Sequence, residues 1–135
     1  MVEKESPPSN IVINCIKAFI VGGIICTIGQ GFMNFFIAFG VDKEQLGSCV
    51  SLVMIFLGAF LTGIGVYDKI GSFAGAGSIV PITGFANSIV SPAMEFKREG
   101  YILGVGAKMF VIAGPVLVYG ISSSIIVGII YYFIK

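Results

Sequence analysis

Long apolar runs separated by short polar stretches make up most of the chain. A helix needs about 20 apolar residues, at about 1.5 Å each, to cross the hydrocarbon core of a bilayer. The run at 11–28 is the first of that length, and Lys17 lies early enough in it to reach the interface. We expect a span near 11–29. The aromatic stretch at 31–40 either extends this helix or lies along the interface.

Two more apolar regions follow. The run at 46–66 predicts a second span, preceded by a polar turn at 41–45. The last region begins at Tyr101 and, at about 34 residues or about 50 Å, is too long for one span of a core about 30 Å thick. Gly114-Pro115 is the expected break, because proline is favoured at the first position of a helix. A third span would end near Ile134 and leave 101–113 as a half-length piece, so the side of the C-terminus stays open.

The segment "GAGSIVPITGFANSIVSPAMEFKREG" at 75–100 is apolar but interrupted. Pro81 and Pro92 each predict a helix break. Thr83 would cap a short helix over 84–90, and Ser91 would cap another that begins with Pro92 and stops at Gly100. Broken helices at membrane depth occur where they are buried in protein or line water. A re-entrant segment at a pore mouth and an amphipathic helix on the membrane surface both fit this pattern.

Composition fixes the fold class. The 135 residues are 56% hydrophobic and only 11% charged, against about 25% charged in a typical soluble domain. We predict an all-α integral membrane protein with about three to four spanning helices and a broken or re-entrant segment around 79–113. The organisation would be a polar tail at 1–10 and a single membrane domain at 11–135. The bias in lysine and arginine puts the N-terminus and 67–100 in the cytosol.

Several functional classes are disfavoured. A net charge of +1 gives no basic surface for nucleic acid. The chain has no histidine, its three cysteines lack CxxC spacing, and no GxxxxGK[ST] motif occurs. We therefore expect no enzyme activity, no metal site and no cofactor.

Lys108 stands out, because an ionisable group in a membrane segment is by default a candidate functional residue. Alternatively it reaches the interface or pairs with Glu95 or Glu99. Small residues also recur at four-residue spacing, which lets membrane helices approach closely. This spacing indicates either packing within the chain or contacts in an oligomer, and we expect an oligomer. The positions are Ala18, Gly22 and Cys26, then Ala59 and Gly63, then Gly120, Ser124 and Gly128.

The 75–100 segment, "GVGAKMFVIAGPVLVYG", "CIKAFIVGGIICTIGQ" and "GVYDK" resemble the SpoVA family of sporulation membrane proteins, of the AC and AEb types. The similarity extends from Asn14 to about Gly128. The polar tail and the chain length are more similar to the AC type.

This resemblance implies a subunit of a channel in the inner membrane of the forespore and spore. Such a channel moves dipicolinic acid, as its calcium chelate, during sporulation and germination. The resemblance also implies other SpoVA-type subunits as partners, including an AEb-type homologue and a soluble partner. The alternative is a membrane scaffold that docks soluble germination proteins. Thr83, Asn87, Ser88 and Lys108 are the candidate solute-pathway residues, and Glu95, Lys97, Arg98 and Glu99 form a candidate cytosolic cluster at a pore mouth or partner site.

Overall fold

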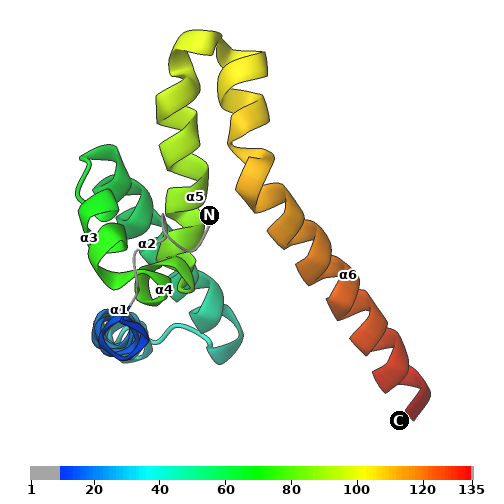
Figure 1. Cartoon of the computed structure of the whole chain (residues 1–135). Coiled ribbons are helices and arrows are strands. Elements are labelled where there is room, and N and C mark those ends of the chain that lie inside the picture. Colours follow the sequence, from blue (N-terminus) through cyan, green and yellow to red (C-terminus); the bar gives the residue numbers. More distant parts are fainter. Residues whose placement is uncertain (1–9, 135) are drawn as a thin grey trace. The chain divides into compact units, whose positions relative to one another are not determined.

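The first apolar run forms one helix, α1 (Ile11–Ala38), in the computed structural model, which describes residues 10–134 (Figure 1). The helix is longer than the expected span at 11–29, because the aromatic stretch continues it. The ring of Phe35 packs on those of Phe36 and Phe39, one turn or less away. Gly40, with φ of +78°, follows the helix end. Apart from Asn10, the predicted polar tail lies outside the described residues.

The second apolar run forms α2 (Lys43–Gly63), which begins two residues inside the expected polar turn. Gly65, with φ of +72°, then redirects the chain into the short helix α3 (Tyr67–Ala74). Gly75, with φ of +53°, leads into the single turn α4 (Ala76–Ile79). Glycine tolerates these left-handed conformations because it has no Cβ.

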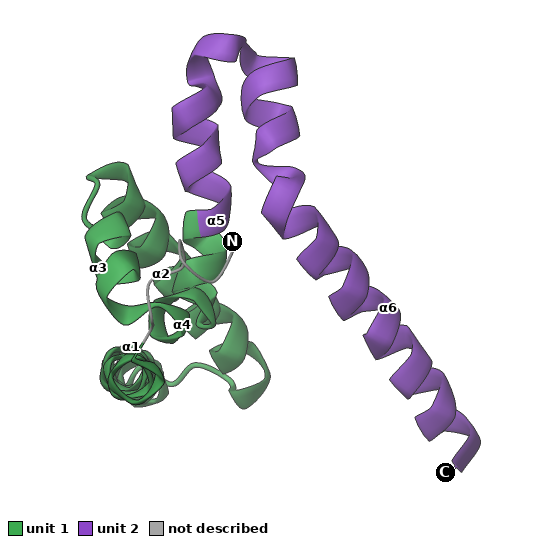
Figure 2. Cartoon of the chain, in the orientation of Figure 1, with its two compact units in different colours: residues 1–87 green, residues 88–135 purple. Residues whose placement is uncertain are grey.

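The described residues divide into two compact units, one that ends at Asn87 and one that begins at Ser88 (Figure 2). In the first, α4 lies against α1, and α3 contacts α1, α2 and α4. A Cβ on Gly77 would stand 2.6 Å from the Cα of Ala18, and one on Gly22 would stand 3.3 Å from the carbonyl oxygen of Gly77. Two of the four-spaced small residues therefore serve packing within the chain. Gly63, Gly120 and Gly128 face open space.

The predicted interruption around 79–113 is present, but its details differ. The helix breaks at Val80-Pro81, and α5 (Ile82–Glu95) begins after it. Thr83 is therefore inside a helix and does not cap one. The predicted break at Pro92 is wrong, because α5 continues through it. A proline already has a helical φ, so an established helix can continue at the cost of one hydrogen bond. Gly100, with φ of +97°, ends the helical run, as expected.

In the second unit, the end of α5 continues into a 3₁₀ turn, η2 (Phe96–Glu99), which packs on a π-helical turn, η3 (Tyr101–Gly106). The helix α6 (Phe110–Ile134) follows. The predicted break at Gly114-Pro115 is wrong, because α6 runs through Pro115. A proline clashes with the carbonyl four residues earlier, here that of Val111. The irregular backbone of this unit lies further toward the N-terminus, in η3 and at Met109.

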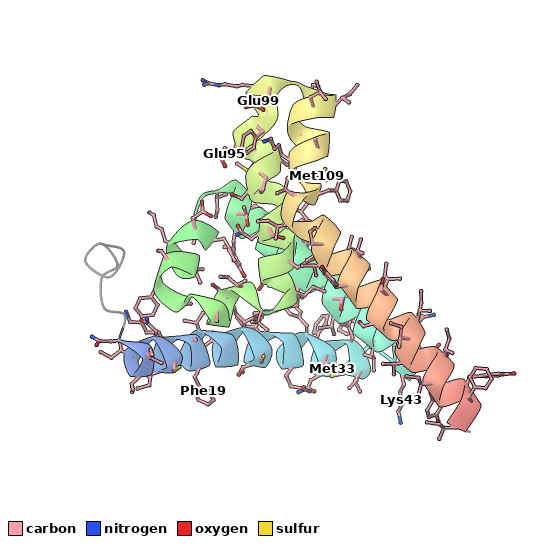
Figure 3. All side chains as sticks on the ribbon, turned by 45° about the vertical axis from the view of Figure 1, so that its right-hand side comes forward. Phe19, Met33, Lys43, Glu95, Glu99 and Met109 are labelled. Carbon is pink, nitrogen blue, oxygen red and sulfur yellow. The ribbon has the colours of Figure 1, made fainter. Side chains whose placement is uncertain are left out.

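Within residues 10–134, three helical stretches are long and apolar enough to cross a membrane: Ile11–Ala38, Lys43–Gly63 and Tyr101–Ile134. The described residues contain no strand. Most large apolar side chains are exposed; Phe19, for example, is 81% exposed and points away from the rest of its unit (Figure 3). Lipid, which is as apolar as these side chains, can cover them. The chain is thus the all-α membrane protein that its composition predicts.

Candidate functional site

A buried tyrosine joins three short elements of the first unit. The Tyr67 hydroxyl of α3 lies 2.7 Å from the backbone carbonyl oxygen of Ser78 in α4 and 2.8 Å from Thr83 Oγ1 in α5. All three residues are buried. Burial raises the pKa of the Tyr67 phenol above its ordinary value, while the hydrogen bond with Thr83 lowers it. The contact fixes the start of α5 just after the helix break.

A second polar pair lies on the same side of α5, four residues further along. Thr62 Oγ1 of α2 lies 2.9 Å from Asn87 Oδ1 and 2.7 Å from the carbonyl oxygen of Gly58. Thr62 is 4% exposed, and Asn87 is half-buried. The close approach of α2 to α5 depends on Gly58, because a Cβ on Gly58 would stand 2.9 Å from the Cα of Thr83. Residues four apart share a helix face, so Thr83 and Asn87 both meet hydroxyl groups of the first unit.

Two of the four predicted pathway residues are thus brought to one helix face. Ser88 is half-buried and directly follows Asn87, so it points to a different side of α5. Tyr67, Ser78 and Thr62 were missed by the sequence analysis. Thr62 lies in an apolar run, where a threonine commonly bonds to the carbonyl four residues earlier. A buried tyrosine hydroxyl usually has a hydrogen-bond partner, but the burial of Tyr67 results from tertiary packing that the sequence pattern does not show.

Lys108 contacts an aromatic ring. Its Nζ lies 4.5 Å from the ring centroid of Phe96 in η2. In the described part of the chain no ion pair joins it to Glu95 or Glu99. A cation over an aromatic face is attracted by the ring quadrupole. The second unit therefore accommodates this charge without a carboxylate partner.

The predicted charged cluster lies at the turn between α5 and α6. All four members are exposed, and Figure 3 shows two of them, Glu95 and Glu99, at this turn. The turn is tight, because Gly104 of η3 faces the carbonyl oxygen of Phe96. A Cβ on Gly104 would stand 3.0 Å from the Cβ of Glu99. A close packing of η2 on η3 therefore presents the cluster at the end of the second unit. Its members are Glu95, Lys97, Arg98 and Glu99.

A separate pocket of about 420 Å³ lies in the first unit between the start of α1 and the α3–α4 junction. Asn14, Cys15 and Phe73 are among its lining residues. Lys17 Nζ lies 4.8 Å from the ring centroid of Phe73. This second lysine–aromatic contact accommodates the only charge within α1. Over the residues described, no three histidine, cysteine or acidic side chains gather as a metal site would require.

Comparison with known proteins identifies the family. The family model described as SpoVAC/SpoVAEB sporulation membrane protein matches residues 14–130. The chain is 50% identical over 132 residues to Stage V sporulation protein AC of Bacillus subtilis (strain 168), covering 97% of this chain and 88% of that protein. No solved structure matches the chain. The chain belongs to the SpoVAC/SpoVAEB family of sporulation membrane proteins.

Proposed function

We propose that the chain is a subunit of a channel that moves dipicolinic acid, as its calcium chelate, across the inner membrane of the forespore and spore. Transport would occur into the spore during sporulation and out of it during germination. The observation that carries this proposal is the half-buried Asn87 on a helix that begins at the break after Val80. Broken helices that carry polar groups recur where membrane proteins bind and pass solutes.

The charge of the cargo fits this site better as a chelate than as a free acid. Dipicolinate alone is a dianion, whereas its one-to-one calcium chelate has a net charge near zero. The polar groups around α5 in the first unit are neutral: two threonines, a tyrosine and an amide. A neutral site compensates a full negative charge poorly in a medium of low dielectric constant. Catalysis, a cofactor and a resident metal ion have no part in this proposal, in which calcium is cargo.

We further propose that the channel is an oligomer that includes an AEb-type homologue and a soluble SpoVA partner. Three candidate spans are few to enclose a solute path alone. On α6, Gly120 and Gly128 face open space, eight residues apart on one side with Ser124 between them. Small residues at this spacing permit close helix contact.

The test is Asn87→Leu, which keeps a side chain of similar volume and removes the amide. Spores of this variant should accumulate severalfold less dipicolinate at an unchanged level of the protein. Asn34→Leu is the matched control, because Asn34 is an exposed amide on α1 whose one side-chain hydrogen bond among the described residues is with Gln30 in the same helix. Normal dipicolinate content in the Asn87→Leu spores would refute the proposed pathway.

The exposed charged cluster favours a second candidate function, a scaffold that docks soluble germination proteins. Its four charges make no ion pair with one another in the described part of the chain, so they are available to a partner. Replacing Lys97 and Arg98 by Gln should then abolish recruitment of a soluble partner to spore membranes. If the chain is a scaffold, Asn87→Leu should leave partner recruitment unchanged. If the chain is a channel subunit, Asn87→Leu should lower the dipicolinate content of spores more than the replacement of Lys97 and Arg98 does.

A further inference from the structure

Thr62 makes two short contacts but has only one hydroxyl proton. Its Oγ1 lies 2.7 Å from the Gly58 carbonyl oxygen and 2.9 Å from a terminal atom of the Asn87 amide, placed as Oδ1. The carbonyl oxygen can only accept a hydrogen bond, and an amide oxygen can only accept one too. If both neighbours were oxygens, one of the two short contacts would have no proton between its atoms.

The distances agree with one placement of the proton. Hydrogen bonds of the O–H···O type are commonest at about 2.7–2.8 Å, and those of the N–H···O type at about 2.9–3.0 Å. The Gly58 carbonyl needs the Thr62 proton, so we assign that proton to Gly58. The Asn87 amide, placed with Oδ1 toward Thr62, is then assigned the opposite orientation, with its nitrogen donating to Thr62 Oγ1. A half-turn of the amide about its χ2 bond gives this arrangement with almost no change in shape.

The same reasoning shows what Asn87 presents outward. Within the described part of the chain, no buried side-chain nitrogen or oxygen lacks a hydrogen-bond partner. The second terminal atom of Asn87 has no partner there, so it is accessible rather than buried. With the nitrogen held by Thr62, this accessible atom is the carbonyl oxygen.

We propose that Thr62 orients Asn87 so that its side-chain carbonyl oxygen faces the solute, and that the site therefore recognises the divalent cation of the transported chelate. This proposal rests on the proposed channel function. Calcium prefers oxygen ligands, including asparagine carbonyls. Carboxylate oxygens of a bare dianion would meet another acceptor and gain no hydrogen bond. Thr62 is thus a positioning residue for selectivity.

The orientation is tested first, independently of transport. In ¹⁵N-labelled protein in detergent, a side-chain amide proton of Asn87 should exchange with water severalfold more slowly than those of Asn34. The Asn34 amide is the internal reference, because it accepts from Gln30 and donates to no described residue. Thr62→Ser should keep the slow exchange and Thr62→Val should abolish it. Equal exchange at Asn87 and Asn34 in the unaltered protein would overturn the proposed orientation.

Selectivity is tested next, in membrane vesicles prepared from spores, which retain the partner subunits. The probes are dipicolinate with excess calcium and dipicolinate with a calcium chelator. The unaltered protein should pass the calcium form faster, and Thr62→Val and Asn87→Leu should each lower that ratio severalfold, while Thr62→Ser preserves it. An unchanged ratio in Thr62→Val would overturn the selectivity role. No dipicolinate flux in any sample, with slow Asn87 exchange, would instead refute the channel function and leave the orientation standing.

Discussion

The ammonium group of Lys108 lies 4.5 Å from the ring centroid of Phe96, across the turn that joins η2 to η3. Lys108 belongs to a candidate span, Tyr101–Ile134, in which it is the only charge. An uncompensated lysine at the centre of a membrane helix costs about 2.5–3.5 kcal/mol on insertion scales. The aromatic face of Phe96 offsets part of that cost, and it does so without removing the charge.

The contact predicts energetic coupling between the two residues. Phe96→Leu should destabilise the protein when Lys108 is present, and it should do so by about 0.5–2 kcal/mol less when Lys108 has been replaced by Met. Unfolding in detergent, followed by circular dichroism, measures each free energy. Lys97→Met is the control, because Lys97 is exposed and has no aromatic partner in the described residues. Strict additivity would show that the contact contributes nothing.

The charge of Lys108 also has a predicted role in transport. Lys108→Ala should reduce the dipicolinate content of spores while the protein level stays near normal. Lys108→Met separates the two components of the side chain, because it keeps the apolar stem and removes the charge. If the charge acts in solute passage, Met should be as defective as Ala. Normal dipicolinate content in Lys108→Met would remove Lys108 from the pathway and leave Asn87 as its main candidate.

Patterns that depend on local chain chemistry were predictable from the sequence. The spans, the interruption near Pro81 and the stop at Gly100 follow from apolar length and from the conformations of proline and glycine. The breaks predicted at Pro92 and Pro115 failed, because a proline removes one hydrogen bond but does not by itself end a helix that neighbouring turns sustain.

The polar contacts of the site depend on tertiary structure. Thr83 and Asn87 were selected as polar residues in an apolar segment, but their partners Tyr67 and Thr62 are 16 and 25 residues away in sequence. No periodicity links residues at such separations. Gly58 was missed for the same reason: the pattern of small residues pointed to Ala59, its neighbour, whereas the backbone of Thr83 approaches Gly58.

Tyr67→Phe should destabilise the first unit. It removes the hydroxyl that joins Ser78 and Thr83, and leaving buried polar groups without partners costs about 1–3 kcal/mol. Thermal unfolding in detergent, followed by circular dichroism, measures the loss. Tyr101→Phe is the control, because Tyr101 is 77% exposed. Equal stability of Tyr67→Phe and the unaltered protein would show that the hydroxyl contacts are dispensable.

The same tyrosine predicts a dependence on pH. Burial holds the pKa of folded Tyr67 above the ordinary 10.0, so the unfolded chain loses this proton first as the pH rises. The favourable contribution is complete below about pH 10 and is lost as the pH rises through the folded-state pKa. The stability advantage over Tyr67→Phe should therefore shrink above pH 10. A gap that stays constant between pH 8 and pH 12 would contradict this shift.

Gly77→Ala tests the close contact between α4 and α1. A Cβ on Gly77 would stand 2.6 Å from the Cα of Ala18, so one of the two backbones must move. Overpacking of this kind typically costs about 1–3 kcal/mol. Gly23→Ala on α1 is the matched control, because nothing lies within 4 Å of its Cβ position. The Gly23→Ala variant should be neutral or stabilising, since alanine favours a helix by about 1 kcal/mol over glycine.

Adding Ala18→Gly to Gly77→Ala should not restore stability, because the obstructing atoms belong to the Ala18 backbone. Rescue by Ala18→Gly, measured as recovery of the unfolding temperature in detergent, would show that the two helices are not in backbone contact.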